Sequence, residues 1–82
     1  MNRNNFISGI SEDLYQLLGV SVNVYEFSAI SRYPFGYYNI TWGKDLKYNI
    51  EIDKNTIGPA RRRDFIEQFQ NQIKLKYPEL LL

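Results

Sequence analysis

A strict alternation of apolar and polar residues runs from Leu46 to Asp53. Successive side chains of a β-strand point to opposite faces, so this period of two predicts a strand with one buried face. The buried face carries Leu46, Tyr48, Ile50 and Ile52. The polar side chains between them face solvent.

The preceding segment, from Phe35 to Trp42, is rich in aromatic and β-branched residues, which predicts another strand after a turn over Ser31–Pro34. If the even-numbered residues of both strands share the inner face, the numbers of paired residues must have an even sum. Pairing Trp42 with Leu46 meets this condition and leaves Gly43–Asp45 as the loop. A two-residue turn would mix the two faces.

The first predicted strand changes phase along its length. Val20–Val24 has apolar residues at every second position, and Tyr25–Ala29 continues the alternation in the other phase. A bulge near Val24 and Tyr25 reconciles the two phases. The sequence therefore predicts a bulged strand here.

A short helix is predicted ahead of the strands, from Ser11 to Leu18. Ser11 is a suitable N-cap, and Gly19 can end the helix in a left-handed conformation. Its buried stripe is formed by Leu14, Leu17 and Leu18.

A longer helix is predicted after the strands. Pro59 suits the first helical position, because a proline there lacks only an N–H that would have no helical partner, and Pro78 sets the end. The core stripe is Ile66, Phe69 and Ile73, with Phe65 beside it.

The element order predicts an α+β fold: one small domain over residues 1–82, arranged helix, three-stranded antiparallel sheet, helix (αβββα). Both helices are expected on one face of the sheet, leaving the other face solvated. Residues 1–5 form a short polar N-terminal arm, and residues 78–82 form an apolar C-terminal tail.

Composition narrows the chemistry. The chain has neither cysteine nor histidine, which removes thiolate nucleophiles, cysteine-ligated zinc and the side chain most used for proton transfer. The carboxylates are scattered; Glu51 and Asp53 share the outer face of their strand and have the ligand type of a hard cation, but solvated surface acids are far commoner. We expect no enzyme activity, no cofactor and no bound metal.

No apolar run is long enough to span a membrane and no secretory leader is recognisable, so we expect a cytoplasmic protein that does not bind membranes.

Arg61, Arg62 and Arg63 are the sharpest local signal. Three cations at a helix start oppose the helix dipole, so something must compensate. One interpretation is a binding site for phosphates or for a partner's carboxylates. The other is local neutralisation by Asp64 and Glu67, with the stem of Arg62 lying along the core.

The order helix, three antiparallel strands, helix with a basic start resembles that of double-stranded RNA-binding domains, in which basic residues at the start of the second helix contact phosphates. The resemblance is in topology. Phe65–Phe69 lacks that family's alanine-rich stripe, and Arg32–Phe35 lacks the Gly-Pro and histidine of its hairpin loop.

Two further features suggest binding surfaces. Tyr33, Phe35 and Tyr37 lie along a turn and the following strand, where they form either an ordinary aromatic rim or a recognition surface. The tail ends in Leu80, Leu81 and Leu82, which either fold back over the domain or mediate self-association.

The neutral balance of ten basic and nine acidic residues, with a formal net charge of +1, favours a protein partner. The first hypothesis is a small non-enzymatic regulator or inhibitor that binds a larger protein or complex, as a monomer or homodimer. Small proteins of phages and mobile elements often act in this way, and eight asparagines against two alanines are compatible with the AT-rich coding typical of such genomes. The alternative is a nucleic-acid-binding module that places Arg61, Arg62 and Arg63 on phosphates.

Overall fold

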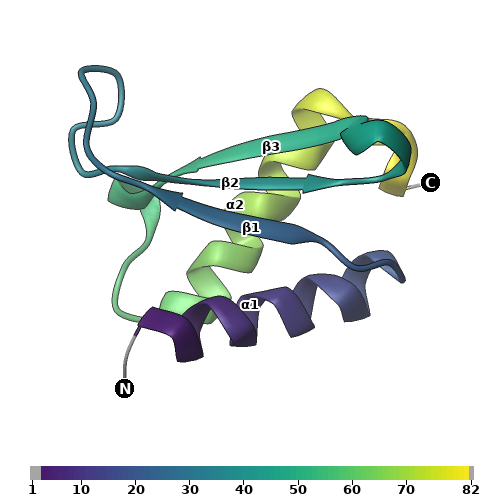
Figure 1. Ribbon diagram of the computed structural model, residues 1–82, viewed down its shortest axis with the longest axis horizontal. Coiled ribbons are helices and arrows are strands. Elements are labelled where there is room, and N and C mark those ends of the chain that lie inside the picture. Colours follow the sequence, from purple (N-terminus) through teal and green to yellow (C-terminus); the bar gives the residue numbers. More distant parts are fainter. Residues whose placement is uncertain (1–2, 82) are drawn as a thin grey trace.

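The computed structural model describes residues 3–81 and has the predicted αβββα architecture. Its main elements are α1 (Arg3–Leu18), β1 (Asn23–Phe27), β2 (Tyr37–Trp42), β3 (Tyr48–Asp53) and α2 (Arg61–Lys76); the short 3₁₀ helices are η1 (Lys44–Leu46), η2 (Lys54–Thr56) and η3 (Pro78–Leu81). The antiparallel sheet has the order β1-β2-β3. Both helices lie on the same side of it (Figure 1).

The core is a single cluster between the helices and the inner face of the sheet. Among the side chains whose burial is described, each helix contributes three buried ones at a spacing of four residues, which places them on one face of that helix. Phe65 lies at the centre, with its ring centroid 6.1 Å from that of Phe6 and 5.5 Å from that of Tyr38. The buried apolar residues are Phe6, Ile10, Leu14, Tyr38, Ile40, Trp42, Ile50, Ile52, Phe65, Phe69 and Ile73.

Helix α1 is longer than predicted. It begins at Arg3, so Ser11 lies within the helix rather than capping it, and residues 3–5 of the expected polar arm are helical. Residues 1–2 lie outside the described residues. The early start follows from burial of Phe6, which continues the stripe of Ile10 and Leu14 by one turn, whereas Leu17 is exposed. Gly19 ends the helix as predicted, with φ 75°.

Helix α2 begins two residues later than predicted, at Arg61 rather than Pro59. The Asp64 carboxylate accepts a hydrogen bond from the Gly58 N–H at 2.9 Å, which fixes the turn before the helix. The helix ends before Pro78, as predicted. Its buried stripe includes Phe65, while Ile66 is only half-buried.

Strand β1 has no bulge. It pairs with β2 in one unbroken register from Asn23 opposite Thr41 to Phe27 opposite Tyr37. The expected change of phase was wrong, because the even-numbered residues stay on the inner side along the whole strand. The residue on the inner side after Val24 is therefore the charged Glu26 and not an apolar residue. Its carboxylate pairs with the Lys54 ammonium at 2.5 Å.

The β2–β3 hairpin has a longer loop than predicted. Trp42 pairs with Tyr48 rather than with Leu46, so the even-sum rule holds but Leu46 leaves the strand and is exposed. The loop makes this possible because Asp45 and Leu46 both have left-handed backbones, with φ 57° and 53°. Strand β2 also starts later than predicted, at Tyr37 rather than Phe35.

Within residues 3–81, no helix combines the length and the apolar character required to cross a membrane.

Candidate binding surface on the open face of the sheet

The face of the sheet opposite the helices is built from the odd-numbered residues of the three strands. The pairing registers place these residues in three rows across the sheet. The rows are Phe27, Tyr37 and Asp53; Tyr25, Asn39 and Glu51; and Asn23, Thr41 and Asn49. We call this surface the open face.

Three rings at one end of the open face form what we call the aromatic cluster: Phe27, Tyr33 and Tyr37. The ring of Tyr37 stacks on that of Phe27, with centroids 4.9 Å apart and planes 15° apart, and contacts that of Tyr33 at 4.7 Å. Tyr25 lies two positions before Phe27 on the same side of β1 and is 48% exposed. The cluster is thus a packed platform that still presents ring surface to solvent.

The turn before β2 carries Tyr33 over the sheet. Ile30 and Tyr33 exchange backbone hydrogen bonds of 3.1 and 2.9 Å, and the Gly36 N–H donates to the Tyr33 carbonyl at 2.8 Å. Gly36 has φ 90°, and a Cβ there would lie 2.6 Å from the Phe27 carbonyl oxygen. The turn therefore requires glycine at this position.

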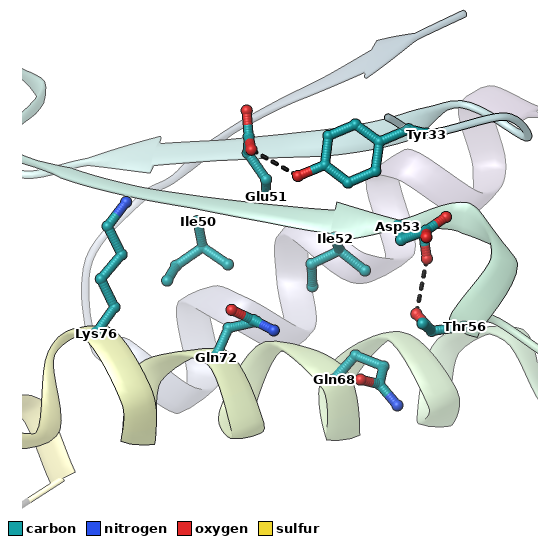
Figure 2. A pocket seen from close by; sticks show the side chains of 9 residues that line it. All are labelled: Tyr33, Ile50, Glu51, Ile52, Asp53, Thr56, Gln68, Gln72 and Lys76. Carbon is teal, nitrogen blue, oxygen red and sulfur yellow. Dashed lines mark hydrogen bonds between the residues drawn. The ribbon is translucent and has the colours of Figure 1, made fainter. Parts of the chain in front are cut away.

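The hydroxyl of Tyr33 is anchored on β3. It donates a hydrogen bond to the Glu51 carboxylate at 2.7 Å (Figure 2). Arg32 donates to the same carboxylate oxygen at 3.2 Å, and its guanidinium lies 4.8 Å from the Tyr33 ring centroid. The hydrogen bond to Glu51, with burial and the negative charge of that carboxylate, raises the pKa of Tyr33 above its ordinary value. Tyr33 is therefore a fixed, neutral member of the cluster at physiological pH.

Apart from Tyr25, the rest of the open face is polar. The Asn39 side-chain amide donates to the Asn49 side-chain oxygen at 2.8 Å. The Glu51 carboxylate accepts hydrogen bonds from Tyr33 and Arg32, and the Asp53 carboxylate accepts one from the Asn55 N–H at 2.9 Å. Both acids therefore have protein partners. In the part of the chain that the structure describes, no group of three or more His, Cys, Asp or Glu side chains is placed to hold a metal ion.

A groove of about 220 Å³ separates the outer edge of β3 from α2 (Figure 2). Gln68 and Gln72 line it from the helix. At one end, the Lys76 ammonium donates to the Asn49 carbonyl at 2.7 Å, and the Asn49 N–H donates to the Tyr77 hydroxyl at 3.1 Å. These contacts occupy part of the strand edge and limit its pairing with another strand.

The three arginines lie on the helix side of the sheet and do not join the aromatic cluster. The Arg62 guanidinium donates two hydrogen bonds to the Asp13 carboxylate, at 3.0 and 2.8 Å, and these raise the pKa of Arg62. The Arg61 guanidinium lies 4.2 Å from the Phe6 ring centroid. Arg63 is exposed.

The sequence predicted Asp64 and Glu67 as the compensating acids, but Arg62 has a different partner in the structure. Asp13 of α1 pairs with Arg62, whereas Asp64 turns back to Gly58. Gly9 makes room for this pairing, since a Cβ there would lie 2.9 Å from Nε of Arg62.

The remaining predicted residues are spread out. Phe35 lies in the turn and is 65% exposed. In the tail, Leu80 packs against the core, Leu81 is exposed, and Leu82 lies outside the described residues.

Tyr25 and Phe27 were not predicted as surface residues, because the expected bulge would have turned both side chains inward. Continuing the phase of Val20–Val24 would have placed both residues outward. That phase places Glu26 on the inner side of the strand, where its ion pair with Lys54 compensates for the partly buried charge.

No family model, curated protein or solved structure matches this chain. The resemblance to double-stranded RNA-binding domains thus remains one of element order.

Proposed function

We propose that the protein is a non-enzymatic binding module, a regulator or inhibitor that recognises a larger protein through the open face of its sheet. The observation that carries this proposal is the aromatic cluster with Tyr25 beside it, partly exposed on the face that the helices leave bare. Tyrosine and other aromatic side chains are enriched at the energetic centres of protein interfaces, because they bury a large area and lose few rotamers.

The cluster is organised before any partner arrives. Tyr37 is packed between Phe27 and Tyr33, and Tyr33 is held by its hydrogen bond to Glu51. Binding would therefore immobilise little that is not already ordered, which lowers its entropic cost.

Charge on the open face favours a protein over a nucleic acid. Arg32 forms an ion pair with Glu51, and Asp53 adds a second carboxylate to the same face. A phosphate backbone laid across the rings would meet these carboxylates, and the three arginines lie on the other side of the sheet. The nucleic-acid alternative therefore draws less support, although Arg63 is available to an anion.

A cytoplasmic location belongs to the same proposal. It is supported by the absence of cysteine, because small secreted domains commonly depend on disulfides.

The test uses the immobilised protein to capture partners from an extract of its source cells. The test variant carries Tyr25→Ala and Phe27→Ala, which remove two exposed aromatic side chains of β1 from the open face. The matched control is Leu75→Ala, which removes a 79% exposed side chain from α2. We expect the wild type and the control to retain one common partner and the double variant to lose it, with similar melting temperatures for all three.

Equal recovery by the double variant would refute the open face as the binding surface. A parallel gel shift with single- and double-stranded DNA and RNA tests the alternative. Binding that weakens steeply with salt and disappears in Arg63→Glu would replace the protein partner with a nucleic acid.

A further inference from the structure

An apolar surface lies at the opposite end of the sheet from the aromatic cluster. The end of α1, the β2–β3 hairpin and η3 meet there, at the right of Figure 1. Several large apolar side chains are exposed on these segments: Leu17 by 38%, Val20 by 45%, Leu46 by 55% and Leu81 by 42%. We call this surface the apolar end.

The apolar end contains a hollow of about 240 Å³. An apolar cavity of about 150 Å³ can hold a benzene molecule, so this hollow has room for a leucine side chain. Its walls come from α1, the sheet and the tail, and are formed mainly by Leu17, Leu18, Val20, Trp42, Tyr48 and Leu80.

Leu46 lies in the hairpin loop between Gly43 and Tyr48, which both line this hollow, and its side chain is exposed. Its backbone is left-handed, with φ 53°, a conformation that is unfavourable for a large side chain and that glycine adopts freely. Leu46 is not part of the core cluster, so its burial does not compensate for this strain. Residues held in such conformations cluster at functional sites.

We propose that the apolar end binds a second copy of this chain in a two-fold dimer, in which Leu46 of each copy enters the hollow of the other. Leu46 and the hollow lie at the same end of the molecule. A two-fold rotation can therefore bring Leu46 of each copy opposite the hollow of the other, as a self-complementary interface requires. The charges also match. The hairpin carries exposed Lys44 and Lys47 around Asp45, while Glu79 is exposed on η3 beside the hollow.

This dimer is independent of the proposed function, because the aromatic cluster lies at the other end of the open face and stays accessible. A dimer would present two copies of it. Loss of dimerisation and loss of partner capture are thus separate results of separate variants.

The first experiment measures mass by sedimentation equilibrium and light scattering from about 10 µM to about 1 mM protein, the range in which weak association is detected. We expect the wild type to dimerise with rising concentration. Leu46→Lys should raise the dissociation constant at least about tenfold, whereas Ile30→Lys, a 49% exposed residue in the turn at the other end, should leave it unchanged. Thermal melts check that both variants fold.

The second experiment tests the geometry. Because the chain has no cysteine, a mixture of Leu46→Cys and Val20→Cys chains should form the mixed disulfide under mild oxidation, in excess over either homodisulfide. A mixture of Ile30→Cys and Val20→Cys should not. A wild type that stays monomeric throughout, a Leu46→Lys variant that dimerises as well as the wild type, or the absence of a preferred mixed disulfide would each overturn the proposal.

Discussion

The Arg62 guanidinium and the Asp13 carboxylate form a two-hydrogen-bond pair that ties the start of α2 to α1. Three arginines at a helix start interact unfavourably with the helix dipole, and a nearby carboxylate reduces this cost. The acid that compensates comes from the other helix, 49 positions away in the chain. The pair therefore compensates one of the three positive charges and links the two helices by a contact that is partly exposed to solvent.

We predict that Arg62→Ala and Asp13→Asn each lower the melting temperature by a small amount, because both side chains are partly exposed and water screens the pair. The double variant should lose less than the sum of the single losses, and the coupling should shrink in high salt. Thermal melts by circular dichroism measure all of these quantities. Arg63→Ala is the control and should melt like the wild type; additive losses would mean that the pair does not contribute.

Two glycines with left-handed backbones should differ sharply in their tolerance of alanine. Gly19, with φ 75°, has open space around its Cβ position, so Gly19→Ala should cost only the backbone strain, about 1 kcal/mol. At Gly36, the new Cβ would also lie 2.6 Å from the Phe27 carbonyl oxygen, so either the turn or β1 must shift.

We therefore expect Gly36→Ala to lower the free energy of unfolding by clearly more than Gly19→Ala, as measured by urea denaturation. It should also disturb the aromatic cluster, which a change in near-ultraviolet circular dichroism would report. Equal losses at the two positions would show that the turn adapts without cost.

The architecture was predictable because its strongest signals are local. The alternation from Tyr48 to Asp53 and the helix limits at Gly19 and Pro78 depend on neighbouring residues alone. The errors arose where a distant partner decides the local structure. Glu26 is acceptable on the inner side of β1 only because Lys54 reaches it from η2, and α1 extends to Arg3 only because α2 and the sheet bury Phe6.

The residues of the candidate surface divide in the same way between local signals and distant partners. Tyr33 and Tyr37 were identified from the aromatic turn, since adjacent strand residues cannot share a face. The arginines were recognised from their charge and their place at a helix start. The partner of Arg62 could not be predicted, because it depends on how the two helices pack. No local feature of the sequence predicts that Leu46 is exposed, because it fits the alternation of apolar and polar residues that continues into β3. Only the pairing of Trp42 with Tyr48 places Leu46 outside the strand.

The hydrogen bond between Tyr33 and Glu51 should make stability depend on pH in the alkaline range. The raised pKa of Tyr33 means that the folded protein keeps the phenolic proton at pH values where the unfolded chain has lost it. This contribution is fully present below the unfolded pKa of about 10 and is lost as the pH rises through the higher folded pKa.

Tyr33→Phe removes the hydrogen bond, so we expect it to lower the free energy of unfolding by about 1 kcal/mol at neutral pH. The difference between wild type and variant should narrow as the pH rises above about 10, because only the wild type loses this contribution. Urea denaturation of both proteins between neutral and alkaline pH measures the difference, and the other tyrosines, present in both, cancel. A constant difference across this range would show that ionisation of Tyr33 is not coupled to folding.

Leu46 provides the sharpest separation of stability from binding. Glycine at this position removes the strain of a left-handed leucine, about 1 to 2 kcal/mol, and adds backbone entropy to the unfolded chain worth about 0.5 to 1 kcal/mol. We expect Leu46→Gly to raise the free energy of unfolding by about 0.5 to 1 kcal/mol, measured by urea denaturation at a protein concentration low enough to keep both proteins monomeric. Leu46→Ala keeps a Cβ and its strain, so it should show no such gain, and a glycine variant less stable than the alanine variant would mean that the hairpin does not carry the strain. Because a single substitution would relieve this strain, an advantage elsewhere is needed to explain an exposed leucine here, and insertion into a second copy of the chain supplies one.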